Sequence, residues 1–80
     1  MKIPRDISGE QLAKLLKKYG FKITRQTGSH MRLTSTAKGE FHITIPKHNP
    51  LKIGTLNSIL TEVSNYLEIE KDLLMDQLFS

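Results

Sequence analysis

The sequence predicts an α+β fold in which two helices cover one face of a three-stranded antiparallel sheet. Apolar residues recur at helical spacing near the start of the chain and again in its second half. Three short segments between these helices alternate apolar and polar residues, as strands with one buried face do. The links between the strands are short enough to require antiparallel neighbours. The predicted order is α-β-β-β-α, a two-layer sandwich, with a short extra helix at the C-terminus.

The first helix is predicted over residues 8–19. Ser8 is suited to the N-cap, and Gln11, three residues later, completes a capping box. One face of this helix carries Leu12, Leu15, Leu16 and Tyr19. Gly20 follows as a residue that tolerates a positive φ and therefore ends the helix.

The three strands are predicted at residues 21–26, 30–34 and 40–45. The alternation gives each of them a buried face, with Met31, Leu33, Phe41, Ile43 and Ile45 pointing inward. Gly28 and Ser29 form the first turn, where Gly28 supplies a positive φ. Pro46 ends the third strand because it has no N–H to donate to a ladder.

Two further helical segments follow a loop over residues 47–52. The second helix begins near Ile53 or Gly54, and its apolar face holds Ile53, Leu56, Ile59, Leu60 and Val63. A last segment at about residues 68–79 has a stripe of Ile69, Leu73, Leu74 and Leu78. Eighty residues have room for one hydrophobic core, so the chain is predicted to be a single domain.

Charge is divided unevenly along the chain. Residues 1–54 hold eleven Lys and Arg against three Asp and Glu, a net charge of +8, whereas residues 55–80 have a net charge of −4. A basic body attracts polyanions such as nucleic acid. The absence of cysteine excludes disulfides and thiolate metal sites. With neither an apolar segment near the start nor an apolar run long enough to span a membrane, the chain is predicted to be a soluble cytoplasmic protein.

The sheet face that the helices leave open is predicted to be polar and basic. Alternation places there Lys22, Thr24, Gln26, His30, Arg32, Thr34, His42 and Thr44. If the second turn centres on residue 37, His30 faces Thr44 and Arg32 faces His42. His30 and His42 would then be diagonal neighbours, roughly 7–8 Å apart.

His30 is the candidate for chemistry on this face. An imidazole with an ordinary pKa of about 6.5 exchanges protons near neutral pH, so it could deprotonate an RNA 2′-OH. Arg25 or Arg32, with nearby lysines, would stabilise charge on the phosphate. The residues alone leave another reading open, in which His30 is a polar strand residue beside a turn. A Ser29–His30 nucleophilic pair is disfavoured, since adjacent strand residues point to opposite faces.

The other two histidines are weaker candidates. His42 is expected to be a surface strand residue that could assist as an acid, and His48 to be a loop residue within reach of a phosphate. Three histidines at these spacings, with no cysteine and few nearby carboxylates, match no common metal-ligand pattern. No metal site and no cofactor are therefore predicted.

Two stretches, "SGEQLAKLLKKYGFKITRQTGSHMRL" and "ITIPKHNPLKIGTLNSIL", closely resemble the HicA toxins of HicA–HicB toxin–antitoxin systems. The shared pattern is a leucine-rich helix ending in Gly-Phe, then Arg-Gln-x-Gly-Ser-His, a strand ending in Ile-Pro-x-His, and Lys-x-Gly-Thr-Leu at a helix start. It covers residues 8–64, which we take as the core of a single HicA-like domain spanning residues 1–80. The acidic extension over residues 65–80 is expected to pack on the core, mediate self-association or contact an antitoxin. The chain also has Ile53 where the family often has proline.

The resemblance implies a double-stranded-RNA-binding-domain-like fold and a metal-independent endoribonuclease, an mRNA interferase. It maps the family's catalytic histidine onto His30. The residues expected to bind RNA are Lys22, Arg25, Gly28, Ser29, Arg32, His42, Lys47 and His48. The implied partners are mRNA and a HicB-like antitoxin that covers this region; a membrane is not among them, and a homodimer is left open.

Two other functions fit the same residues. One is a non-catalytic RNA-binding module on the same fold, and the other is a small interaction protein that docks HicB-like partners. The basic charge favours RNA as a partner over protein docking alone.

Overall fold

The computed structural model describes residue 4 and residues 6–79, and it confirms the predicted α+β fold. Its elements are α1 (Gly9–Leu16), the 3₁₀ helix η1 (Lys17–Tyr19), β1 (Lys22–Gln26), β2 (His30–Ser35), β3 (Phe41–Pro46), α2 (Ile53–Leu67) and α3 (Lys71–Phe79). The sheet is antiparallel with the order β1-β2-β3, and the arrangement is the one found in double-stranded-RNA-binding domains. Residues 1–3 and 5, on which the prediction of no N-terminal targeting segment partly falls, lie outside the described residues.

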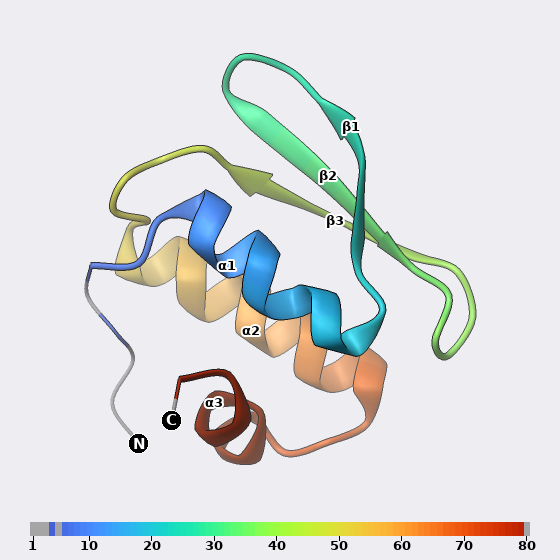
Figure 1. The fold of residues 1–80 in the computed structure, drawn as a ribbon. Helices are drawn as coiled ribbons and strands as arrows, with labels where there is room; N and C mark the ends of the chain where they lie inside the picture. Colours follow the sequence, from blue (N-terminus) through green and yellow to red (C-terminus); the bar gives the residue numbers. More distant parts are fainter. Residues whose placement is uncertain (1–3, 5, 80) are drawn as a thin grey trace.

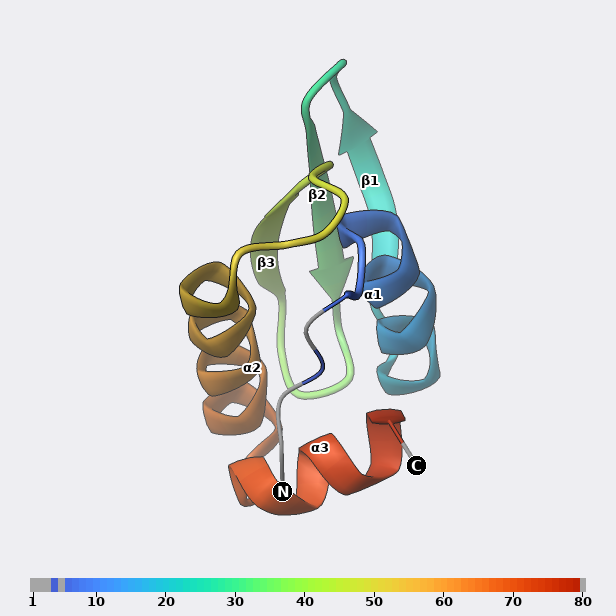
Figure 2. The same ribbon diagram turned by 90° about the vertical axis from the view of Figure 1, so that its left-hand side faces the viewer.

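Helices α1 and α2 run side by side on one face of the sheet, and α3 crosses near their ends (Figures 1 and 2). The tip of the β1–β2 hairpin projects beyond the helix layer in both views. No helix of residues 6–79 lies on the other face of the sheet. The fold therefore leaves one sheet face and one hairpin tip free for a ligand.

The start of α1 is fixed by its cap and by a close backbone approach. Ser8 and Gln11 form the predicted capping box, with hydrogen bonds of 2.8 and 3.1 Å. Gly9 donates its N–H to the carbonyl of His48 at 3.0 Å, and a Cβ built on Gly9 would overlap the carbonyl oxygen of Pro46. The absence of a side chain at Gly9 thus brings α1 against the end of β3.

One hydrophobic core joins the two layers, and α3 belongs to it. Leu74, Met75 and Leu78 of α3 are almost fully buried in this core, so the acidic extension packs on the domain. Lys18 also donates to the carbonyl of Gln77 at 2.8 Å. Beside it, the Tyr19 hydroxyl donates to the Gln77 side chain, and burial raises the pKa of Tyr19, which keeps that donor protonated.

Three apolar residues predicted to be buried lie at the surface instead. Ile53, the first residue of α2, is 42% exposed, and Leu73 is 48% exposed because the buried face of α3 is formed by Leu74, Met75 and Leu78 instead. Ile23 is 38% exposed, and every residue of β1 is exposed. Of the strand predicted over residues 21–26, only Phe21 is buried, and it precedes β1. The buried face predicted for the rest of the strand was wrong, because the β1–β2 hairpin extends beyond the helices (Figure 2).

The register between β2 and β3 also differs from the prediction. His30 lies opposite Pro46, and Arg32 lies opposite Thr44. The link over residues 36–40 centres on Lys38 rather than on residue 37, with Gly39 at a φ of 89°. The Tyr66 hydroxyl holds this link, since it accepts the Lys38 N–H at 2.8 Å and donates to the Gly39 carbonyl at 2.6 Å. When the centre of the link moves by one residue, the partner of each β2 residue moves by two positions along β3. Because side chains alternate with a period of two, every side chain stays on its predicted face.

No helix among the described residues combines the length and the apolar character needed to cross a membrane.

The approach of α1 to β3 predicts opposite effects for two glycine substitutions. Gly9→Ala is expected to lower the free energy of unfolding by about 1–3 kcal/mol, because the new methyl group must displace the Pro46 carbonyl. Gly54→Ala, in the first turn of α2 with open space around the added Cβ, should leave stability unchanged or raise it by up to about 1 kcal/mol. Urea unfolding of both variants measures this. Equal stability of the two variants would contradict the close packing of Gly9.

Candidate nucleic-acid interface

Thr27 holds the hairpin tip together. Its N–H donates to the His30 carbonyl at 2.9 Å, and its hydroxyl oxygen accepts the N–H groups of Ser29 at 3.3 Å and of His30 at 3.1 Å. Gly28 does not have the positive φ predicted for it, and a Cβ built there would meet nothing within 4 Å. The turn is closed by the threonine side chain, so its geometry does not require a glycine.

His30 opens β2, and its exposed ring contacts Ser29. The Ser29 hydroxyl oxygen lies 3.0 Å from Nδ1 of His30. The expectation that these neighbours point apart was wrong, because Ser29 belongs to the turn and strand alternation begins only at His30. Nε2 of His30 makes no hydrogen bond within the described part of the chain, so this nitrogen is free to act on a ligand.

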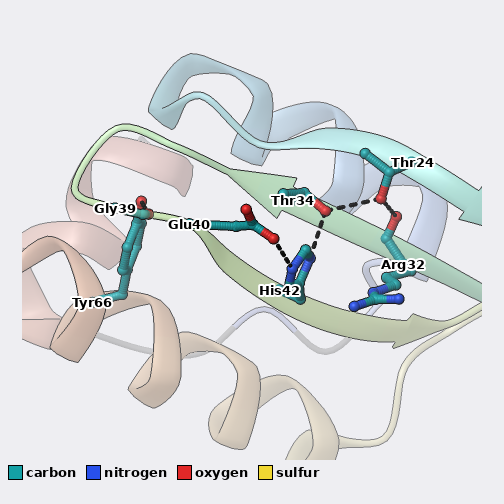
Figure 3. Close-up of polar contacts among 7 residues, drawn as sticks. All are labelled: Thr24, Arg32, Thr34, Gly39, Glu40, His42 and Tyr66. Carbon is teal, nitrogen blue, oxygen red and sulfur yellow. Dashed lines mark hydrogen bonds and ion pairs between the residues drawn. The ribbon is translucent and has the colours of Figure 1, made fainter.

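A β-bulge in β1 places Arg25 on the open face. Ile23 pairs with Leu33 and Arg25 pairs with Arg32, so Thr24 is an extra residue in β1. The Thr24 hydroxyl bonds to the Arg32 carbonyl at 3.3 Å and to the Thr34 hydroxyl at 2.9 Å, as Figure 3 shows. After the bulge, each side chain of β1 lies on the face opposite to the one that strict alternation predicts.

This reversal corrects one predicted position. Gln26 pairs with Met31, a buried residue, and so lies on the helix side of the sheet rather than on the open face. Arg25 takes its place beside Arg32.

Arg25 and Arg32 form a like-charged pair next to His30. Cα atoms of directly opposed residues lie about 4.5–5.5 Å apart, and His30 is two residues from Arg32 on the same face of β2. Neither guanidinium forms an ion pair with a carboxylate of the described residues. Like charges directly opposite each other on a sheet are destabilising, and an anion placed between them removes that cost.

His42 belongs to a separate cluster on the same face. Its Nε2 lies 2.8 Å from Oε2 of Glu40, and its Nδ1 lies 2.7 Å from the Thr34 hydroxyl, which continues the chain to Thr24 (Figure 3). Because His42 pairs with Thr34 rather than with Arg32, it stands about 13 Å along the strands from His30. The prediction that the two histidines are diagonal neighbours was therefore wrong.

The remaining predicted site residues, Lys47, His48 and Lys22, lie at the His30 end of the sheet and near its middle. The Lys47 N–H donates to the Ser29 carbonyl at 2.8 Å, which ties the loop after β3 to the hairpin tip. His48 is exposed in that loop, and its carbonyl accepts from Gly9. Lys22 is exposed opposite Thr34. Lys47 and His48 therefore lie at the same end of the sheet as His30, whereas Lys22 lies nearer the His42 cluster.

Nε2 of His30 lies on the open face of the sheet, outside the two surface hollows nearest to a pocket in shape. One surface hollow lies beside the start of β1, lined by Lys17, Gly20, Phe21, Lys22 and Ile23, and another lies along α1. Neither includes His30. Residues 4 and 6–79 contain no group of three or more side chains suited to hold a metal ion. His30 is exposed at the start of β2, so a ligand can reach it directly from solvent.

The fold is that of a double-stranded-RNA-binding domain, and its open sheet face carries an imidazole beside two arginines that form no ion pair with a described carboxylate. A family model described as the HicA toxin of bacterial toxin–antitoxin systems matches residues 9–64 of the chain. The chain therefore belongs to the HicA toxin family and is the toxin member of a toxin–antitoxin system, which pairs it with an antitoxin. No curated protein and no solved structure shows significant similarity to it.

Sequence reasoning missed Thr27 and the role of Thr24. A threonine two residues before Ser29, at the first position of a turn, is a recognised signal for a side-chain-closed turn. No comparable signal marks Thr24, because the bulge depends on how β1 is paired rather than on its composition.

Removing the Thr27 hydroxyl should loosen the tip without unfolding the domain. In Thr27→Val the N–H groups of Ser29 and His30 lose their acceptor, so their hydrogen exchange should accelerate, and stability should fall by about 1 kcal/mol. Thr27→Ser keeps the hydroxyl and should behave as the wild type. Residue-resolved exchange by NMR measures the effect. Unchanged exchange of both amides in Thr27→Val would show that Thr27 does not hold the turn.

Proposed function

We propose that this HicA-family chain is a metal-independent endoribonuclease that cuts mRNA, with His30 as general base. The observation that supports it best is the opposed Arg25–Arg32 pair beside His30, because a phosphodiester between the guanidiniums would place its ribose near the imidazole. Family membership supports the same activity. This is the chemistry expected of a chain whose basic face lies opposite its helices.

In the proposed reaction, Nε2 of His30 takes the proton of the 2′-OH. The 2′ oxygen forms a bond to phosphorus while the bond from phosphorus to the 5′ oxygen breaks, and that oxygen takes its proton from solvent water. Arg25 and Arg32 donate to the non-bridging oxygens, where negative charge accumulates. His42 is too far from His30 to protonate the same phosphate's leaving group, so we assign it no part in this step.

The RNA extends along the face from this phosphate. Gly28 and Ser29 meet the backbone at the hairpin tip, with Lys47 and His48 beside them, and Lys22 contacts the backbone towards the other end. Nε2 of His42 is already bonded to Glu40, so RNA that contacts this nitrogen has to share it with the Glu40 carboxylate. A HicB-like antitoxin would cover this face, and mRNA as substrate places the toxin in the cytoplasm. Self-association into a homodimer is compatible with these contacts.

His30→Ala should abolish RNA cleavage and leave RNA binding within about twofold, because the arginines that hold the phosphate remain. Cleavage of a labelled RNA, with and without chelator, and binding by fluorescence anisotropy measure the two effects. Asp76→Asn, on α3, is the matched control and should cut as the wild type does.

Two outcomes would contradict the proposal. Wild-type protein that binds RNA but never cuts it would be a non-catalytic RNA-binding module. Cleavage that survives in His30→Ala would move the base elsewhere.

Gly28→Ala tests whether this glycine serves the RNA rather than the turn. The methyl group would meet no protein atom, so the unfolding free energy should change by less than about 0.5 kcal/mol. It would occupy the space through which the RNA backbone approaches, so kcat/KM should fall by about tenfold or more. Urea unfolding and cleavage kinetics on the same preparation separate the effects. A destabilised variant with normal kcat/KM would assign Gly28 to the fold.

A further inference from the structure

The contact between Ser29 and His30 has a chemical consequence that depends on where two protons lie. The Ser29 hydroxyl oxygen and Nδ1 of His30 are 3.0 Å apart, and only one of these two atoms can donate in this bond. If serine donates, Nδ1 accepts, the neutral ring carries its proton on Nε2, and Nε2 cannot accept another proton. If Nδ1–H donates, the lone pair of Nε2 is free and the ring is a base.

A phosphate at the hairpin tip would select between these two arrangements. Ser29 is exposed, and its hydroxyl has a single proton. When that proton is donated to a phosphate oxygen, the serine oxygen can only accept from Nδ1–H. We propose that Ser29 is the positioning residue for His30: RNA binding directs the serine proton outward and thereby fixes His30 in the tautomer that leaves Nε2 as base. This inference rests on the proposed function.

The same bond persists after proton transfer. When Nε2 takes the 2′-OH proton, the imidazolium still donates Nδ1–H to Ser29, and the bond becomes charge-assisted and therefore stronger. Ser29 thus supports the charged form that develops during the reaction. A serine that donated to Nδ1 would leave the proton on Nε2, and the ring could not take the 2′-OH proton at that nitrogen.

The backbone fixes Ser29 independently of its side chain. Its N–H donates to the Thr27 hydroxyl at 3.3 Å, and its carbonyl accepts the Lys47 N–H at 2.8 Å. Neither bond uses the serine hydroxyl. Ser29→Ala therefore removes the contact with the ring while keeping the turn, and Ser29→Thr restores a hydroxyl at the same place.

The direct test is the tautomer of His30, read from the imidazole ¹⁵N shifts at about pH 8, where an ordinary imidazole is neutral. The probe is an oligonucleotide made wholly of 2′-O-methyl nucleotides, which binds without being cut. In the wild type and in Ser29→Thr, the probe should shift His30 towards the Nδ1–H form. In Ser29→Ala it should not, while the shifts of His42 match those of the wild type with the same probe and report an intact face. The same tautomer in wild type and Ser29→Ala, with probe bound, would overturn the inference.

Kinetics provide the second readout. Ser29→Ala should lower kcat by about tenfold, the lower end for one lost charge-assisted hydrogen bond, with KM changed by less than about threefold, and Ser29→Thr should recover most of kcat. If RNA is cut in a His30-dependent way but Ser29→Ala keeps wild-type kcat, only the role of Ser29 fails. If the wild type does not cut RNA, the proposed function fails, and the tautomer measurement still decides whether Ser29 sets the proton on His30.

Discussion

The pairing of Thr24 and Arg25 against the single residue Arg32 is the constraint on which the interface depends. Strict alternation along β1 would direct Arg25 to the helix side, where it would meet the apolar layer without a partner. The bulge inserts one residue and reverses the parity, and the Thr24 hydroxyl fixes it through the Arg32 carbonyl. Bulges are common in edge strands, and β1 is an edge strand whose residues are all exposed. The projecting hairpin therefore accommodates the bulge that brings the two arginines together.

Local rules predicted the parts of this fold whose determinants are local. The capping box of Ser8 and Gln11, the left-handed Gly20 and the buried faces of β2 and β3 all follow from residues within a few positions of one another. The open face was also predictable, because two helices can cover only one side of a sheet. Placing His30 there required no more than alternation along β2.

Pairing between strands was not predictable in the same way. The register of β2 and β3 depends on the centre of a five-residue link, which is set by a hydroxyl from α2, Tyr66, far away in the sequence. The bulge depends on which residue of β1 is skipped, and composition does not reveal it. An error of one residue at the link centre preserved every face, yet it leaves His42 about 13 Å along the strands from His30, its expected diagonal neighbour. Faces follow from single strands, whereas distances between functional groups follow from register.

The proposed reaction can proceed on an open face because RNA carries its own nucleophile. Most active sites exclude water so that it neither weakens electrostatic interactions nor competes as a nucleophile. In RNA the nucleophile is the adjacent 2′-OH, which is already held next to phosphorus by the ribose, so its effective concentration far exceeds what a free water offers. The protein then needs only a base in the right tautomer and positive charge beside one phosphate. In the proposed mechanism Ser29–His30 and Arg25–Arg32 would supply these from the hairpin turn and the two strands beside it, and a partner that covers this one end of the sheet would block both at once.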